Sequence, residues 1–303
     1  MGAGAGLLGL VAGGSYLLNK ETEANRFLEE FPDMMHGAGE VRKYRTSGAK
    51  KCLVHILQMH YIRWIEEERM KGVREVQNEI YNIISNLLNR GLISNVYGEG
   101  VVDEEHEKRI ILHKKESDDI LEKSFKENHG LKLSKINDMI GNLELELNDE
   151  ARIKSKYPDI NEAKNYKNKL DQEIKKYKKL IVEEEEYRMD IGKSMNISKL
   201  NKSALERLVE EGKIRLLAAE TQDANYKAVS AINDSNEFDK MVLDNRENIL
   251  LKIISDSNNA LNIAVYGGAH NFLDNVDRWN NQNIDKKYSL IEVIPKSYMK
   301  CIK

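Results

Sequence analysis

Cysteine and proline are both scarce in this chain of 303 residues, which contains two cysteines and three prolines. Cys52 lies in an apolar stretch and Cys301 near the end of the sequence, so there is neither a disulfide framework nor the paired cysteines of a structural zinc site. Acidic and basic residues almost balance, with a net charge of −3, and this composition does not favour nucleic acid as a partner. The seven histidines are therefore the first residues to search for chemistry.

Long hydrophobic runs are rare as well, and the segment Met1–Leu18 is the candidate for contact with a membrane. It carries no charged side chain and is rich in glycine and alanine. Its length approaches the roughly 20 apolar residues that span a bilayer, but the basic start of a secretory signal is missing. We therefore expect a membrane anchor or the remnant of a signal, and a membrane-anchored or exported protein whose orientation stays open. A glycine-rich tail on a cytoplasmic protein is the alternative.

Apolar runs of strand length alternate with helical patterns in two separate parts of the chain, residues 49–102 and 212–303. Strands are predicted at residues 52–58, 92–97, 214–219, 261–266 and 289–294. Helices are predicted between them at residues 73–91, 203–212, 236–255 and 270–282. This alternation is typical of an α/β domain, a mainly parallel sheet flanked by helices. The polar residues 19–48 are predicted to be a linker.

Residues 103–211 interrupt the α/β pattern. Apolar side chains recur at intervals of three and four over residues 133–147 and 163–181, and about half of residues 150–190 are charged. Two such helices joined by a short polar loop predict an inserted antiparallel helical hairpin. The hairpin is expected to be a solvated charged arm, and an arm for partner binding or oligomerisation is the alternative.

Polar side chains follow four of the predicted strands, namely His60, Glu99, Glu220 and His270. Because the carboxyl ends of parallel strands lie along one edge of a sheet, these four side chains are expected to gather there. Two histidines and two carboxylates suit a divalent metal that polarises a carbonyl group or activates water. Without a metal, the same groups could act as a general acid and a general base.

The strand at residues 261–266 ends in two glycines, Gly267 and Gly268, which allow a sharp turn and a close approach of the backbone to a ligand. His270 then stands where a helix is predicted to begin. Arg246, on the preceding helix, is expected to orient a carboxylate, to bind an anionic substrate group or to form an ordinary ion pair. Asp274, one helical turn beyond His270, is the expected hydrogen-bonding partner of that histidine.

The other histidines carry weaker signals. His55 lies inside a predicted strand and is expected to be a core residue. His106, His113 and His129 fall in or beside charged helical sequence and are expected to face solvent.

Taken together, these residues resemble the superfamily that joins the TIKI and TraB proteins, the ChaN haem-associated proteins and the erythromycin-esterase type hydrolases. That superfamily has two Gly-x-x-His motifs in the two halves of an α/β domain, together with acidic residues and an arginine. Residues 267–270 match the second motif, whereas Leu57 replaces the glycine of the first motif before His60. The resemblance covers residues 50–102 and 212–295.

The resemblance implies a hydrolase that cleaves a peptide or ester bond in a peptide or small-molecule substrate. As in the TIKI proteases, a divalent metal would be held by His60, Glu99 and His270. As in the esterase branch, a histidine and glutamate site would instead work without metal. The alternatives are a haem- or metal-binding protein of the ChaN type and a non-catalytic membrane-anchored scaffold.

Overall fold

The computed structural model describes residues 23–59, 67–234 and 240–301. The chain forms two compact units. The first unit combines residues 1–112 with residues 202–303 and contains the sheet, and the second is residues 113–201.

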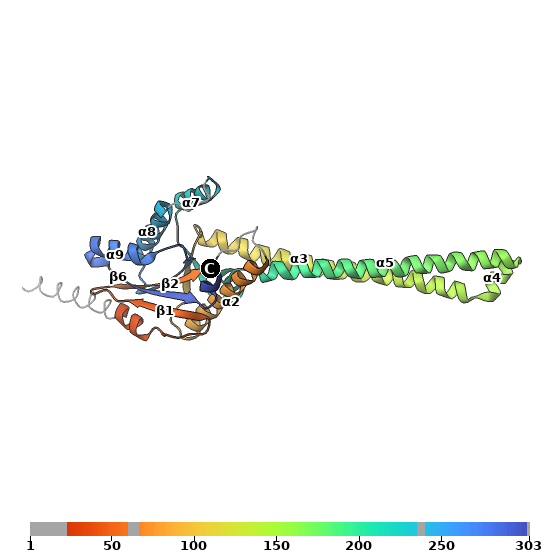
Figure 1. The fold of residues 1–303 in the computed structure, drawn as a ribbon, viewed down its shortest axis with the longest axis horizontal. Helices are drawn as coiled ribbons and strands as arrows, with labels where there is room; N and C mark the ends of the chain where they lie inside the picture. The colour runs from red at the N-terminus through yellow and green to blue at the C-terminus, as the bar shows by residue number, and fades with distance from the viewer. Residues whose placement is uncertain (1–22, 60–66, 235–239, 302–303) are drawn as a thin grey trace, which may run out of the picture. The chain divides into compact units, whose positions relative to one another are not determined.

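The first unit is built on a six-stranded sheet with the order β1-β6-β2-β5-β3-β4 (Figure 1). Its strands are β1 (Ala38–Tyr44), β2 (Lys51–Gln58), β3 (Asn95–Gly98), β4 (Arg215–Ala218), β5 (Leu261–Gly267) and β6 (Tyr288–Pro295). The strand β1 runs antiparallel to β6, and all the other paired strands are parallel. The prediction of an α/β domain with a mainly parallel sheet, split in sequence, is therefore confirmed.

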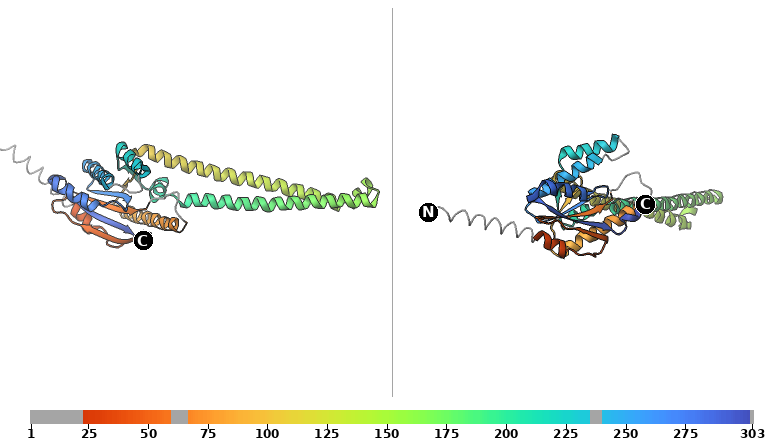
Figure 2. Two further views of the ribbon diagram at one scale, coloured as in Figure 1. Left: turned by 45° about the horizontal axis from the view of Figure 1, so that its top comes forward. Right: turned by 60° about the vertical axis from the view of Figure 1, so that its left-hand side comes forward.

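Helices cover both faces of this sheet, with α2 (Glu67–Asn89) on one face and α8 (Lys240–Asp256) and α9 (Phe272–Gln282) on the other (Figure 2). Side chains of α2 such as Ile80 and Ile84 pack with Val54 and Ile56 of β2. Leu250 and Leu251 of α8 belong to the core of the opposite face. Because β2 and β5 are covered on both faces, their sequences are continuous apolar runs. The remaining helical elements of this unit are residues 23–30, α6 (Ala204–Glu210), α7 (Gln222–Asp234), α10 (Tyr298–Cys301) and a short 3-10 helix (Ile284–Lys286).

The prediction of a linker over residues 19–48 is wrong where that range is described, because it contains a helix at residues 23–30 and the strand β1. β1 is the edge strand beside β6, so it has only one strand neighbour. Its side chains are mostly exposed or half-buried, and it carries Glu40, Arg42 and Lys43. An edge strand of this composition gives no apolar pattern in the sequence.

The second unit is helical. It contains α4 (Glu150–Lys156) and most of the long helices α3 (Glu104–Asn148) and α5 (Ile160–Leu200), which extend well beyond the predicted ranges 133–147 and 163–181. Ile136 and Ile140 of α3 form an apolar cluster with Ile174 of α5. The prediction that His129 faces solvent is wrong. His129 is 5% exposed, and its Nδ1 lies 3.0 Å from Glu184 Oε1. The ring can be buried because Glu184 of α5 gives its nitrogen a hydrogen-bonding partner.

Among the residues that the structure describes, no helix is long and apolar enough to cross a membrane. The predicted anchor or signal segment Met1–Leu18 lies outside the described residues.

Candidate functional site

Three of the four predicted strand-end residues meet at the carboxyl edge of the sheet. Glu99 directly follows β3, Glu220 comes after β4, and His270 comes after the turn that ends β5. His270 Nε2 lies 3.3 Å from Glu99 Oε1, and Arg246 of α8 contacts both Glu99 and Glu220. The fourth residue, His60, lies outside the described residues.

Arg246 joins the two carboxylates. Its Nη1 lies 2.9 Å from Glu99 Oε1, and its Nε lies 3.1 Å from Glu220 Oε2 while Nη2 contacts the other Glu220 oxygen. All three side chains are almost completely buried. Burial alone would lower the pKa of Arg246, but the hydrogen bonds to Glu220 and the charge of Glu99 outweigh it and raise that pKa. Arg246 thus forms ion pairs with two buried carboxylates.

Glu99 is also held by the glycine turn. Its Oε2 accepts a hydrogen bond of 2.5 Å from the backbone N–H of Gly267 and one of 3.3 Å from the side-chain amide of Gln58. The two oxygens therefore face different partners: Oε1 faces Arg246 and His270, and Oε2 faces the ends of β2 and β5. This carboxylate is fixed from three sides.

The second glycine of the turn is required by packing. A Cβ at Gly268 would overlap the hydroxyl group of Tyr298 in α10. Neither Gly267 nor Gly268 has a positive φ angle, so conformational freedom is not the reason for glycine here. The backbone N–H of Gly268 donates to Gln58 O at 3.1 Å, which ties the turn to the end of β2. The close approach at Gly268 is to the side chain of Tyr298, and the predicted approach of this turn to a ligand stays a prediction.

His270 lies between two carboxylates. Its Nδ1 is 3.0 Å from Oε1 of Glu247, the residue that follows Arg246 on α8. Burial acts to lower the pKa of His270, but the hydrogen bonds to Glu247 and Glu99 outweigh it, and that pKa is raised above its ordinary value of 6.5. Asp274, the partner predicted from sequence, accepts instead from the side-chain amide of Asn271 at 2.8 Å.

Glu247 is not among the site residues that the sequence predicts. The signal that could have found it is the helical spacing of α8, where Leu243, Leu250 and Ile254 are buried and place Glu247 on the same inward face. A charged residue on a buried helix face needs a partner, and His270 is that partner.

His55 is the core residue that the sequence predicts, and it lies in the same layer of side chains as the site. It is fully buried in β2, with its ring centroid 4.7 Å from that of Phe272. Neither ring nitrogen has a hydrogen-bond partner among the described residues. Burial, reinforced by the neighbouring charge of His270, lowers the pKa of His55 to about 3, so the ring is neutral at physiological pH.

Both oxygens of Glu99, a predicted metal ligand, face groups of the protein in the described residues. In the described ranges no group of three His, Cys, Asp or Glu side chains is arranged to hold an ion. The position beside Glu99 Oε1 where a cation would bind is taken by the guanidinium group of Arg246. The oxygen Oε2 is turned toward hydrogen-bond donors, which repel a cation.

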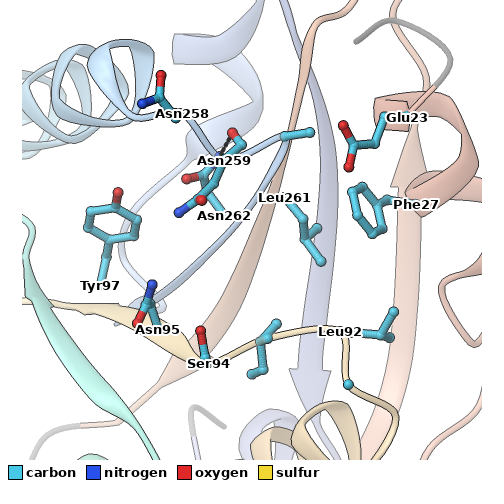
Figure 3. Close-up of a pocket in the computed structure, with 13 residues that line it drawn as sticks. Glu23, Phe27, Leu92, Ser94, Asn95, Tyr97, Asn258, Asn259, Leu261 and Asn262 are labelled. Atoms are coloured by element: carbon cyan, nitrogen blue, oxygen red, sulfur yellow. Dashed lines mark hydrogen bonds between the residues drawn. The ribbon is translucent and has the colours of Figure 1, made fainter. Parts of the chain in front are cut away.

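A separate cavity of about 340 Å³ lies at the opposite edge of the sheet (Figure 3). Its lining includes Asn95 and Leu261, the first residues of β3 and β5, together with Glu23 and Phe27 from the helix at residues 23–30. Figure 3 shows the amide groups of Asn95, Asn259 and Asn262 on one side and Phe27 and Leu92 on the other. Since Glu99 and His270 follow the carboxyl ends of the same strands, this cavity is distinct from the site described above.

Comparison with known proteins adds no assignment. No protein-family model, curated protein or solved structure matches this chain. The features of this chain that point to a function are therefore its own, and the main one is the buried cluster of Glu99, Glu220, Arg246 and His270, together with Glu247.

Proposed function

We propose that this protein is a hydrolase that cleaves a peptide or ester bond with Glu99 and His270 as its catalytic residues. The observation that carries the proposal is the 3.3 Å approach of His270 Nε2 to Glu99 Oε1 at the carboxyl edge of a parallel sheet. Burying several charged groups together is costly, and such clusters occur preferentially at functional sites. A histidine and a carboxylate in contact are the groups that general acid–base catalysis requires.

In the proposed reaction, Glu99 accepts a proton from a water molecule, and the oxygen of that water attacks the acyl carbon of the substrate. His270 donates a proton from Nε2 to the leaving oxygen or nitrogen as the acyl bond breaks. The pKa of His270 is raised by its contacts with Glu247 and Glu99, a direction that favours the protonated ring that the acid role requires. Arg246 holds Glu99 in place through the 2.9 Å contact of its Nη1 with Oε1 of that carboxyl group.

This proposal uses the metal-independent form of the chemistry, because Arg246 already neutralises the carboxylate that a metal would need. A haem- or metal-binding protein is the competing assignment, and metal analysis and the visible absorption spectrum of the purified protein separate the two. Anchoring or export through Met1–Leu18 belongs to the same proposal and is supported by the absence of charged residues from that segment.

We further propose that α3 and α5 form the inserted antiparallel hairpin and that it is an arm for a partner or a second copy. Three contacts support the antiparallel direction, because the residues of α5 that come later in the sequence contact residues of α3 that come earlier. Glu146 pairs with Tyr166 at 2.7 Å, Glu144 with Lys178 at 2.8 Å and His129 with Glu184 at 3.0 Å. A zero-length carbodiimide cross-linker should therefore join the Lys178 amine to the Glu144 carboxylate, and absence of this cross-link in mass spectrometry would contradict the pairing.

The hydrolase proposal is tested with a panel of activated esters and short peptides on the purified full chain. We expect turnover of at least one class, and a fall of roughly 100-fold to 10,000-fold in Glu99→Gln and His270→Gln, the usual contribution of general acid–base groups. His113→Gln is the matched control, since His113 is exposed on α3. Circular dichroism verifies that the variants fold. Equal turnover in all four proteins would refute the assignment, and bound haem without turnover would support the binding protein.

A further inference from the structure

His270 has a second carboxylate partner whose geometry differs from that of Glu99. The Oε1 atom of Glu247 lies 3.0 Å from His270 Nδ1, and the same oxygen accepts the backbone N–H of Asn271 at 3.1 Å. One oxygen on α8 thus contacts both the ring of His270 and the backbone of the next residue. A ring and a backbone held by one atom leave little freedom for the side-chain torsions of His270.

Glu247 also completes the start of α9. Asn271 is the N-cap residue of this helix and makes no side-chain capping hydrogen bond. The carboxylate of Glu247 accepts the backbone N–H of this N-cap residue, and a negative charge at a helix N-terminus is favourable. The position of Glu247 is therefore fixed by the helix that follows His270 as well as by its own helix.

In the described part of the chain, Glu247 is the carboxylate that contacts Nδ1 of His270, and the neighbouring carboxylates have other partners. Asp274 bonds to the amide group of Asn271, and Glu99 faces Nε2. The ring of Tyr266 meets the His270 ring edge-on with centroids 5.0 Å apart, which restricts rotation of the imidazole. Glu247 itself is 1% exposed, so water does not screen its contact with the histidine.

We propose that Glu247 is the positioning residue of His270: it keeps a proton on Nδ1 and directs Nε2 toward Glu99 and the reacting bond. The protonated ring carries a proton on each nitrogen, and an acceptor at Nδ1 retains the proton there, so Nε2 is the nitrogen that gives up its proton in the reaction. Glu247 acts through His270 and does not contact the substrate. This inference rests on the proposed function only for its consequence in turnover, since the placement of the proton is a property of the protein alone.

The test is NMR of the histidine rings in the full chain labelled with ¹⁵N-histidine, with the His270 signals assigned by their loss in His270→Asn. The parent should show a slowly exchanging, hydrogen-bonded Nδ1 proton. Glu247→Ala should lose this proton signal, whereas Glu247→Gln, which keeps an acceptor oxygen, should retain it at a changed chemical shift. Asp274→Asn and Asp256→Asn remove carboxylates from α9 and α8 without touching His270, and both should leave the signal unchanged.

In turnover, Glu247→Ala should lower kcat by about 10-fold to 100-fold with KM within about twofold, the cost typical of losing a group that orients a functional histidine. Glu247→Gln should recover part of this loss. A protected Nδ1 proton that persists in folded Glu247→Ala, or that is absent from the parent, would overturn the inference. Absence of hydrolysis in the parent would instead remove the proposed function and leave the NMR result to decide the role of Glu247.

Discussion

The fully buried His55 should make the first unit sensitive to acid, and the substitution His55→Leu should remove that sensitivity. Its pKa falls from 6.5 to about 3 on folding because burial disfavours the charged ring. A group whose folded pKa is depressed in this way is neutral in the native state while the unfolded chain takes up a proton. The unfolded state therefore binds more protons below pH 6.5, and stability falls as the pH decreases.

The magnitude follows from the two pKa values. Between pH 7 and pH 5 the unfolded histidine goes from mostly neutral to almost fully protonated, while the buried ring stays neutral. Because the unfolded chain takes up a proton that the native state does not, the free energy of unfolding falls by about 2 kcal/mol between pH 7 and pH 5. The result changes little for any folded pKa below about 4, because the native ring remains neutral at pH 5 in every such case.

The assay is urea unfolding of the parent and of His55→Leu at pH 7 and pH 5, followed by tryptophan fluorescence. We expect the stability of the variant relative to the parent to rise by about 2 kcal/mol when the pH is lowered. Ile56→Val, a neighbouring buried change in β2, is the control and should differ from the parent by about 0.5–1.5 kcal/mol at both pH values. A difference between His55→Leu and the parent that stays constant across the two pH values would refute the reasoning.

Four further outcomes follow from the site. Replacing Arg246 with Met leaves Glu99 and Glu220 buried without their cation and should cost about 3–5 kcal/mol in urea unfolding, whereas Arg278→Met, at a half-exposed pair with Asp244, should cost at most about 1 kcal/mol. Gly268→Ala should destabilise by about 1–3 kcal/mol through overlap with Tyr298, while Gly141→Ala, in open space within α3, should be neutral or stabilising; equal effects would exclude the overlap as the cause. The folded pKa of His270 is raised, so its contribution to stability is complete below pH 6.5 and is lost as the pH rises through the folded value; His270→Gln should thus be more destabilising at pH 6 than at pH 9 in unfolding experiments, and the reverse order would contradict the ion pairs. Chelation with EDTA should leave turnover unchanged, and loss of activity that zinc or another divalent ion restores would show that a metal is required.

The sequence predicts those parts of the molecule whose burial leaves a regular apolar pattern. The strands β2 and β5 are buried on both faces, so their sequences are continuous apolar runs that are recognised directly. The strand β1 is exposed along much of its length and leaves no such pattern. In the site, Glu99 and His270 could be predicted because parallel strands bring their carboxyl ends together, a consequence of topology alone.

The partners of these residues depend on how helices pack against the sheet. Asp274 is one helical turn from His270 in sequence, but Glu247 reaches the imidazole from a different helix. His129 likewise lies in charged sequence, and its burial depends on Glu184, 55 residues away. Contacts of this kind are set by the rotation of one helix relative to another element, and the spacing of residues within either segment does not encode that rotation.

The contact between Gly268 and Tyr298 also has an evolutionary consequence. Because the aromatic side chain fills the space beside the glycine, the two positions share one volume near the site. A lineage that gains a side chain at position 268 must lose bulk at position 298 or shift the end of β6 and α10. We therefore expect that, among related chains, a larger residue at position 268 occurs together with a smaller residue at position 298. The residue at position 298 would then predict the size of the residue in a turn some 30 residues earlier.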